Sequence, residues 1–294
     1  MKILVLGGDG MLGHQLLQLL SSRHEVRVTL RQEFAAYAAC SVFSPSNAFA
    51  GVDVRVSDRV LAVLSEFHPD AVVNAVGIVK QRPDGLDVIP NLEINALLPH
   101  RLALICRATG SRFIHISTDC VFSGSRGHYR EDDRPDPVDI YGHSKLLGEV
   151  AAEGAITLRT SIIGLGLGLF RKTSLIDWFM RQNSRVYGYR NAIFSGFTTK
   201  ELSRVIEMLL VEHPAASGLY HLSSAPTSKY ELLVRLRDKL GLRTDIQPDD
   251  DFRCDRSLDS TRFRKDFSYV PPTWDDMLDE LANDIRNRPH DISG

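Results

Sequence analysis

The sequence predicts an α/β protein built on a doubly wound parallel sheet, with a smaller α/β part at its C-terminal end. Short apolar runs alternate with amphipathic helical segments from residue 2 to residue 159, as in strands that crossover helices connect. The first apolar run, residues 2–6, leads directly into a group of glycines. The pattern changes after residue 163, where a loose glycine-rich stretch begins. A chain of 294 residues is long enough to form one or two such domains.

The composition indicates a globular protein whose main partner is not a highly charged macromolecule or membrane. The chain has 35 basic and 37 acidic residues, so neither nucleic acid nor an anionic membrane surface is expected as its main partner. Its four cysteines form no C-x-x-C pair, which disfavours a zinc site or a disulfide framework, and no metal site is predicted. The sequence contains no signal-peptide pattern and no apolar run of membrane-spanning length. We therefore expect a cytoplasmic protein.

Three glycines separate the first predicted strand from a helix predicted at residues 14–21. Gly7, Gly10 and Gly13 have the spacing G-x-x-G-x-x-G. Glycines permit a tight turn and a close approach of the backbone to a pyrophosphate, while the helix N-terminus offers N–H groups and a positive dipole end. Their place between a strand and a helix favours a dinucleotide site of the Rossmann type over a merely tight turn.

The second predicted strand, residues 25–30, ends at Arg31. An acidic residue at this position would bind the ribose 2′-hydroxyl of NADH, whereas an arginine can pair with the 2′-phosphate of NADPH. We therefore predict NADPH as the preferred cofactor, with NADH as a second option. The alternative is that Arg31 is an ordinary solvated arginine.

Two further strands are predicted at residues 52–56 and 71–77, on either side of a helix at 58–67. The second of these strands runs into a loop that contains Lys80 and Gln81. Ligands of parallel α/β sheets bind outside the carboxyl ends of the strands, so both side chains are candidate substrate contacts. A solvated loop lysine is an equally good interpretation of Lys80.

A helix is predicted at residues 91–109 and a strand at 112–117, directly before Thr118. Tyr141 and Lys145 follow at i and i+4, so they share one face of a helix. A hydroxyl at a strand end that faces a tyrosine and a lysine can move a proton onto a carbonyl oxygen. We expect the lysine, together with a cationic nicotinamide, to lower the pKa of the tyrosine, and also to hold the nicotinamide ribose. The alternative is a chance pair on a helix surface.

Residues 164–294 are predicted to bind the substrate, and residues 1–163 to form the cofactor-binding sheet domain. The segment 195–222 is expected to return to that domain. Three adjacent aspartates at 249–251 are interpreted as a solvated turn rather than as a cation site. Asn95, within the long helix, is interpreted as a structural hydrogen-bonding residue rather than as a brace for the active site. The remaining predicted elements are strands at 156–159 and 218–222 and helices at 175–182, 198–211, 229–240 and 274–286.

Several of these stretches together resemble the extended short-chain dehydrogenase/reductases, and most closely the dTDP-4-dehydrorhamnose reductase branch. The Thr-Asp-x-Val-Phe and Tyr-Gly-x-Ser-Lys pieces are the specific parts, and the likeness extends over nearly the whole chain. The stretches that carry it are 7–13, 117–122, 129–137, 141–149, 159–161 and 255–259.

The resemblance implies an NADPH-dependent reductase of a nucleotide-linked 4-keto-6-deoxy sugar, in polysaccharide or deoxysugar biosynthesis. It leaves room for a homodimer. It assigns catalysis to Thr118, Tyr141 and Lys145, and contacts with the sugar to Thr118 and Asp119. The residues that it assigns to the cofactor are Gly10, Met11, Leu12, Arg31, Asp53, Val54, Ala75, Val76 and Gly77.

The chain departs from the family pattern at two single positions near the sugar and in the loop at residues 78–81, which is less polar than is usual in the family. Cys120 stands where the family has an aromatic residue, and Ile162 replaces a tryptophan that would lie against the sugar. Two alternatives to a reductase are considered. The first is a nucleotide-sugar epimerase or dehydratase on the same fold, and the second is a non-catalytic NADP-binding subunit that regulates a partner enzyme. The complete set Thr118, Tyr141 and Lys145 argues against the second alternative, because a regulatory subunit has no chemical need for all three.

Overall fold

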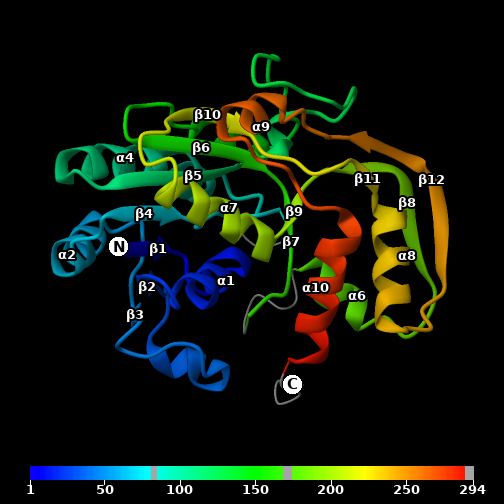
Figure 1. Ribbon diagram of the computed structural model, residues 1–294, viewed down its shortest axis with the longest axis horizontal. Coiled ribbons are helices and arrows are strands. Elements are labelled where there is room, and N and C mark those ends of the chain that lie inside the picture. The colour runs from blue at the N-terminus through cyan, green and yellow to red at the C-terminus, as the bar shows by residue number, and fades with distance from the viewer. Residues whose placement is uncertain (81–84, 168–173, 289–294) are drawn as a thin grey trace.

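The computed structural model describes residues 1–80, 85–167 and 174–288 of the chain. Within these residues, seven parallel strands form the larger sheet in the order β10-β6-β5-β4-β1-β2-β3, which Figure 1 shows from top to bottom. The chain winds outward from β1 in one direction and from β4 in the other, which confirms the predicted doubly wound sheet. The strands are β1 (Lys2–Leu6), β2 (Glu25–Thr29), β3 (Ala48–Phe49), β4 (Ala71–Asn74), β5 (Arg112–Thr118), β6 (Ala155–Thr160) and β10 (Gly218–His221).

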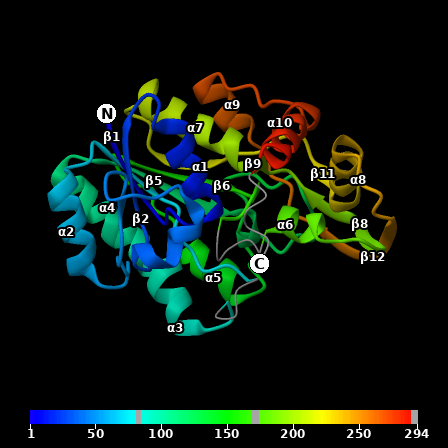
Figure 2. The same cartoon turned by 90° about the horizontal axis from the view of Figure 1, so that it is seen from below.

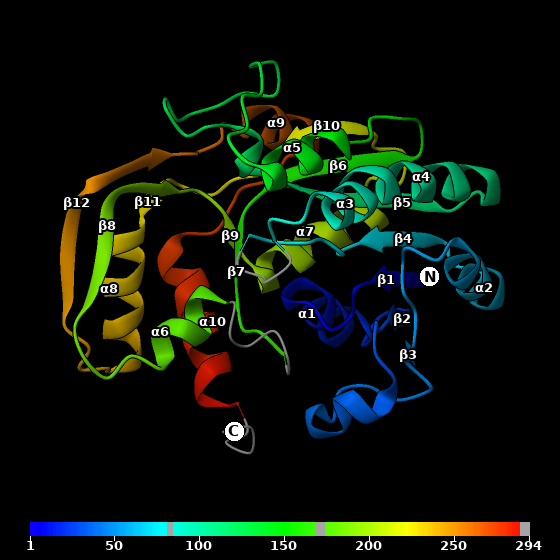
Figure 3. The same ribbon diagram turned by 180° about the vertical axis from the view of Figure 1, so that it is seen from behind.

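Helices cover both faces of the larger sheet. Helices α1 (Met11–Leu20) and α7 (Thr199–Val211) share a core with one face, while α2 (Ser57–Phe67) and α4 (Leu98–Thr109) share a core with the other. Helix α7 lies in front of the sheet in Figure 1, and α4 lies in front of it in Figure 3. Alternate residues of the buried strand β1 supply the two cores, because successive strand residues point to opposite faces. Among the described helices, none is long and apolar enough to cross a membrane.

The smaller sheet lies beside the larger one, at the right of Figures 1 and 2. Its described strands have the order β11-β8-β12, with β8 and β12 parallel and β8 and β11 antiparallel. A short parallel pair of strands, β7 and β9, lies between the two sheets. The elements of this region are β7 (Ile162–Ile163), α6 (Leu175–Met180), β8 (Val186–Phe194), β9 (Phe197–Thr198), β11 (Thr227–Ser228), α8 (Lys229–Leu240), β12 (Ile246–Asp255) and α10 (Trp274–Arg286).

The chain returns to the larger sheet after leaving it. Strand β10 pairs with β6 at the edge of that sheet, and α7 shares a core with α1 on one of its faces. Helix α9 (Thr261–Phe267) packs on the same edge, where the ring centroid of Phe263 lies 5.9 Å from that of Tyr220. Residues far beyond position 163 therefore complete the larger sheet and its helical cover.

The predicted third strand at residues 52–56 is wrong. The third strand is the two-residue β3, within a region to which the sequence assigned no structure and which also contains the 3₁₀ helix η1 (Phe34–Cys40). Asp53 explains the difference, because its Oδ1 accepts the backbone N–H of Arg55 at 3.0 Å and so closes a turn. Strand β4 similarly ends at Asn74 rather than at residue 77, because the Asn74 side chain accepts the N–H of Val76 at 3.2 Å.

The helix predicted at residues 91–109 begins earlier and is not uniform. It includes a π-helical segment, a feature that often marks functional sites. Asn95 lies in this segment, where its side chain exchanges two hydrogen bonds with the backbone of Ile78, at 2.9 and 3.0 Å. It therefore fixes the loop after β4, in agreement with the structural role that the sequence favoured. The successive parts are α3 (Val88–Asn91), η2 (Leu92–Leu97) and α4.

The aspartates at 249–251 do not form a solvated turn between elements. They lie within β12, at a bulge where the register with β8 shifts between Asp249 and Arg253. Strand β8 itself was not predicted, because Gly188, Arg190 and Asn191 interrupt its apolar alternation. Helix α9 was also missed, since its seven residues are mostly charged.

Candidate active site

The turn between β1 and α1 requires its glycines. Gly7 has φ +86°, a conformation that side chains rarely adopt. A Cβ on Gly13 would lie 2.0 Å from the carbonyl oxygen of Gly7, so the helix can start this close to the turn only with glycine there. Gly10 is the N-cap of α1, and the first turn of this helix carries no acidic side chain. The positive end of the helix dipole is therefore suited to a pyrophosphate.

A cavity of about 660 Å³ runs along the carboxyl ends of the parallel strands and reaches the smaller sheet. This volume is typical of a ligand site. Gly13 does not line it, because it packs beneath the turn, and Gln81 lies outside the described residues. No described group of three His, Cys, Asp or Glu side chains could hold a metal ion. The predicted site residues that line the cavity are Gly7, Gly10, Met11, Leu12, Arg31, Asp53, Val54, Ala75, Val76, Gly77, Lys80, Thr118, Asp119, Tyr141, Lys145 and Ile162.

Helix α5 (Ile140–Leu147) is held against the loop that follows β5. Its N-cap residue, Asp139, accepts the backbone N–H of Gly142 at 2.8 Å. A Cβ on Gly142 would lie 2.3 Å from the carbonyl oxygen of Cys120, so this glycine permits the close contact. The same loop is fixed by Thr118, whose hydroxyl accepts the N–H of Cys120 at 3.1 Å. These contacts place the end of β5 beside the first turn of α5.

Thr118, Tyr141 and Lys145 converge on one wall of the cavity. Thr118 is the last residue of β5 and is buried, and its hydroxyl also donates to the Asp119 carboxylate at 3.3 Å. The Lys145 ammonium is buried and donates to the carbonyl oxygen of Ile116 at 2.6 Å. This contact ties the lysine to the same strand that carries the threonine.

Burial shifts the pKa values of both ionisable members of this group. Burial raises the pKa of Tyr141 above its usual range, and this outweighs the hydrogen bond with Thr118 that lowers it. The sequence predicted a lowered pKa for Tyr141. That prediction is wrong as far as the protein's own groups are concerned, because their net effect raises the pKa. These surroundings keep the phenol protonated at neutral pH, which is the form that can donate a proton. Burial lowers the pKa of Lys145 to about 8, while the Glu149 carboxylate acts in the opposite direction.

Lys80 lies above the ring of Tyr141. Its Nζ is 2.5 Å from Oδ2 of Asp139 and 5.6 Å from the ring centroid of Tyr141. Burial raises the pKa of Asp139, but hydrogen bonds from Gly142 and Lys80 more than compensate and lower it overall. The loop after β4 is thus tethered to the N-terminus of α5.

A charged group lies at the other end of the cavity, near the end of β2. Arg31 is exposed and lines the cavity together with Asp53 and Arg55. The Arg55 guanidinium pairs with the Asp53 carboxylate, with an Nη2–Oδ2 distance of 2.5 Å. The hydrogen bonds from Arg55 lower the pKa of Asp53, and the charge of Arg31 acts in the same direction. The two arginines therefore bring positive charge to this end, where Asp53 pairs with Arg55 and the carboxylate of Asp9, which also lines the cavity, accepts the Tyr37 hydroxyl at 2.7 Å. Arg55 was not identified from the sequence.

Comparison with known proteins shows the family to which the chain belongs. The family model described as the RmlD substrate binding domain matches residues 1–287. The chain belongs to this family. This match confirms the resemblance to the dTDP-4-dehydrorhamnose reductase branch that the sequence motifs indicated.

Individual relatives of the chain support this assignment. The chain is 31% identical over 253 residues to the spore coat polysaccharide biosynthesis protein SpsK of Bacillus subtilis, which covers 83% of this chain and 81% of that protein. It is 27% identical over 252 residues to a dTDP-4-dehydrorhamnose reductase of Aggregatibacter actinomycetemcomitans, covering 81% and 79%. A solved structure of a hypothetical dTDP-4-dehydrorhamnose reductase from Sulfolobus tokodaii matches with a TM-score of 0.75 and 27% identity, covering 94% and 98%.

Two cations of this RmlD-family chain line the cavity but were not identified from the sequence. Lys229 is the first residue of α8, and its Nζ lies 3.9 Å from the ring centroid of Phe194. Burial lowers the pKa of Lys229 to about 8, and the charge of Asp119 acts in the opposite direction. Arg256 follows β12, and its Nε donates to the carbonyl oxygen of Phe122 at 2.8 Å. Arg256 belonged to a stretch that carries the family resemblance, but no local signal placed either cation at the site.

A buried ion pair of the RmlD-family chain is connected to the end of β5, next to Thr118. The Glu149 carboxylate accepts two hydrogen bonds from the Arg159 guanidinium, both at 2.8 Å, and one from the Ser117 hydroxyl at 2.7 Å. The guanidinium also lies 3.1 Å from Nε2 of His221. The exposed fractions of the paired side chains are 4% for Arg159 and 10% for Glu149. This network connects the end of α5 with β5, β6 and β10.

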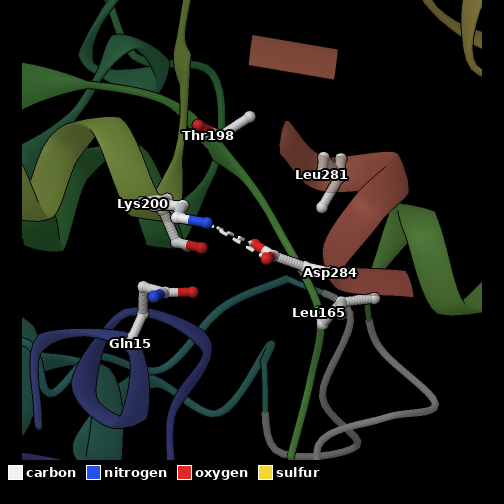
Figure 4. A pocket seen from close by; sticks show the side chains of 7 residues that line it. Gln15, Leu165, Thr198, Lys200, Leu281 and Asp284 are labelled. Atoms are coloured by element: carbon white, nitrogen blue, oxygen red, sulfur yellow. Dashed lines mark hydrogen bonds and ion pairs between the residues drawn. The ribbon is translucent and has the colours of Figure 1, made fainter. Parts of the chain in front are cut away.

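A small crevice of the RmlD-family chain lies between α1, α7 and α10 (Figure 4). Its volume of about 10 Å³ has room for roughly one water molecule, so it is not a site for an organic ligand. Figure 4 shows Lys200 of α7 pointing toward Asp284 of α10, with an Nζ–Oδ1 distance of 3.0 Å. The ion pair links the cover of the larger sheet to the C-terminal helix.

Proposed function

We propose that this chain is an NADPH-dependent reductase of a nucleotide-linked 4-keto-6-deoxy sugar. The observation that carries the proposal is the convergence of Thr118, Tyr141 and Lys145 on a cavity that also reaches the glycine-rich turn. A proton donor and a dinucleotide site in one cavity are the parts that carbonyl reduction requires. The family membership supports a sugar nucleotide as the class of substrate.

The residues at the carboxyl ends of β1 and β2 fit a dinucleotide phosphate. The N-terminus of α1 would hold the pyrophosphate, since Gly10, Met11 and Leu12 of that turn line the cavity. Arg31 and Arg55 would bind the ribose 2′-phosphate, and Asp53 would hold Arg55 in place. Val76 and Gly77 would pass beside the cofactor at the end of β4. Tyr141 and Lys145 would hold the nicotinamide ribose.

The proposed reaction is a proton-coupled reduction of the sugar carbonyl. When bound, the cofactor supplies a hydride to the carbonyl carbon. The Thr118 hydroxyl, which donates to the Asp119 carboxylate at 3.3 Å in the structure, would turn its single O–H to the carbonyl oxygen and orient it. The Tyr141 phenol, which burial keeps protonated, gives its proton to the same oxygen to form the alcohol. The Lys145 ammonium, held at the carbonyl oxygen of Ile116, stabilises the resulting phenolate until solvent returns the proton.

The substrate side of the cavity would hold an anionic nucleotide next to a sugar. Lys229 and Arg256 provide positive charge for a diphosphate, because phosphate recognition depends on cationic donors. Asp119 would accept hydrogen bonds from sugar hydroxyls. Ile162 would pack an apolar side chain against the sugar ring, and Cys120 would leave more room than an aromatic residue. Lys80 would contact the substrate only by leaving its pair with Asp139.

The alternatives make different demands on the cofactor. An epimerase or a dehydratase regenerates its cofactor and shows no net consumption of NADPH. Dehydratases also use acidic residues beside the catalytic hydroxyl. Asp119 supplies one at 3.3 Å from the Thr118 hydroxyl, but Cys120 rather than a glutamate follows it. A regulatory subunit would bind NADPH without turnover.

The test is a spectroscopic screen of NADPH oxidation over several nucleotide-linked 4-keto sugars. We expect stoichiometric oxidation with at least one of them, and a product whose mass is higher by two hydrogens. Product formation without net oxidation would replace the reductase by an epimerase or dehydratase. Tight NADPH binding without any product would favour the regulatory subunit.

Arg31→Ala is expected to weaken the binding of NADPH by about 10-fold and to leave the binding of NADH nearly unchanged. The loss corresponds to one exposed charge-assisted hydrogen bond to the 2′-phosphate, at about 1.4 kcal/mol. The dissociation constants of both cofactors can be measured by fluorescence titration. Arg59→Ala is the matched control, because Arg59 is also exposed but does not line the cavity. Equal losses of affinity for the two cofactors would show that Arg31 does not bind the 2′-phosphate.

A further inference from the structure

An aromatic pair lies at the outer part of the cavity, on the smaller sheet. The ring centroids of Tyr189 in β8 and Phe252 in β12 are 4.9 Å apart. Phe252 lines the cavity, yet 50% of its surface is exposed, and Tyr189 is 40% exposed. The pair thus keeps a large apolar surface in contact with solvent at the edge of the cavity. Exposed aromatic surface in such a place is typical of ligand binding.

The bulge in β12 is what turns Phe252 toward the cavity. Extra residues between Asp249 and Arg253 break the regular register with β8. The Asp249 carboxylate fixes this irregular backbone, because its Oδ1 accepts the N–H groups of Asp251 at 3.0 Å and of Phe252 at 3.3 Å. Bulges often redirect a side chain next to an active site. The position of the Phe252 ring is therefore built into the strand.

Phe252 begins a row of cavity residues that leads to the catalytic wall. Phe252, Cys254 and Arg256 all line the cavity, at intervals of two residues. At about 3.3 Å per residue, Phe252 and Arg256 are separated by roughly 13 Å along the chain. Arg256 reaches the loop beside Thr118, since its Nη1 lies 3.6 Å from Sγ of Cys120. An apolar surface, a cation and the reacting hydroxyl thus follow one another along the cavity.

We propose that Phe252, supported by Tyr189, is the surface on which the nucleobase of the substrate stacks. This inference rests on the proposed function, because it assumes a nucleotide-linked sugar. A base on Phe252 places the ribose over Cys254, the diphosphate at Arg256 and Lys229, and the sugar at Thr118. Aromatic rings bind nucleobases through their faces, so the platform accepts different bases with similar affinity.

The test measures the affinity of free nucleoside diphosphates for the full chain saturated with NADPH. Isothermal titration with dTDP, UDP and GDP is compared for the wild type and for Phe252→Ala. We expect the variant to bind each diphosphate that the wild type binds about 5- to 100-fold more weakly, as the loss of one stacked base predicts. Phe252→Trp should retain most of the affinity, because it keeps an aromatic face. The affinity of inorganic pyrophosphate should be the same in all three proteins.

Tyr187→Ala is the matched control. Tyr187 lies on the same strand as Tyr189 and is 61% exposed, but it does not line the cavity. Its substitution should leave nucleotide affinity unchanged. Unchanged affinity in Phe252→Ala would overturn the platform and leave the proposed function standing. Equal loss of pyrophosphate and nucleotide binding would also overturn it, because the effect would then be a general distortion. Failure of every nucleoside diphosphate to bind the wild type would overturn both the platform and the proposed substrate class.

Discussion

Tyr141→Phe is expected to reduce turnover by about 10²- to 10⁴-fold while NADPH affinity falls much less, because Lys145 would still hold the nicotinamide ribose. The substitution removes only the phenolic oxygen, so the ring keeps its place beside Lys80 and the cavity keeps its shape. The carbonyl oxygen then has no donor that can complete the reduction. Single-turnover kinetics with an accepted keto sugar would measure the chemical step directly, and fluorescence titration would measure the cofactor.

Tyr187→Phe serves as the control for the same chemical change at an exposed position. Its turnover should match that of the wild type. A Tyr141→Phe enzyme that retains most of its turnover would show that another group donates the proton, and the assignment of Tyr141 as the acid would fail.

Glu149→Ala is expected to destabilise the fold by about 3–5 kcal/mol, because it leaves the buried Arg159 guanidinium without its partner. The same substitution releases the Ser117 hydroxyl, directly before Thr118. Urea unfolding followed by circular dichroism would measure the change in free energy. Asp245→Ala provides the comparison, since Asp245 pairs with Arg185 at the surface with exposed fractions of 50% and 64%.

The exposed pair should contribute about 0–1 kcal/mol, as surface ion pairs usually do. Similar losses in Glu149→Ala and Asp245→Ala would mean that burial of the Glu149–Arg159 pair does not determine its contribution. The difference between the two variants therefore measures how much more the buried pair contributes to the free energy of unfolding than the exposed pair does.

The parts of the site that the sequence predicted are those with local signals. Thr118 ends an apolar strand, and Tyr141 and Lys145 are one helical turn apart, so short stretches of sequence were enough to identify them. The contacts of Lys229 and Arg256 depend on how the smaller sheet packs, and no spacing in the sequence reports that packing. The protein's own surroundings raise the pKa of Tyr141, opposite to the effect expected of the lysine, because burial cannot be read from a helix motif alone.

The errors in the fold have a common physical origin. Strand β3 contains only two residues, and β8 carries glycine and polar residues among its apolar ones, so neither has a clear two-residue alternation. Side chains also compete with backbone pairing. Asp53 and Asn74 each accept a backbone N–H two residues ahead, and each shortens or replaces a strand that the apolar pattern predicted.

Because β10 returns to the larger sheet, the two parts of the protein are not two consecutive stretches of the chain. A fragment of residues 1–163 would lack β10 and α7, so β6 would become an unprotected edge strand and the apolar face of α1 would lose its neighbour. Exposed edges of this kind promote aggregation. Exchange of the C-terminal part between relatives by a single crossover would therefore also replace one strand of the cofactor-binding sheet. Chimaeras with altered sugar specificity would need to keep residues 199–221 with the N-terminal parent.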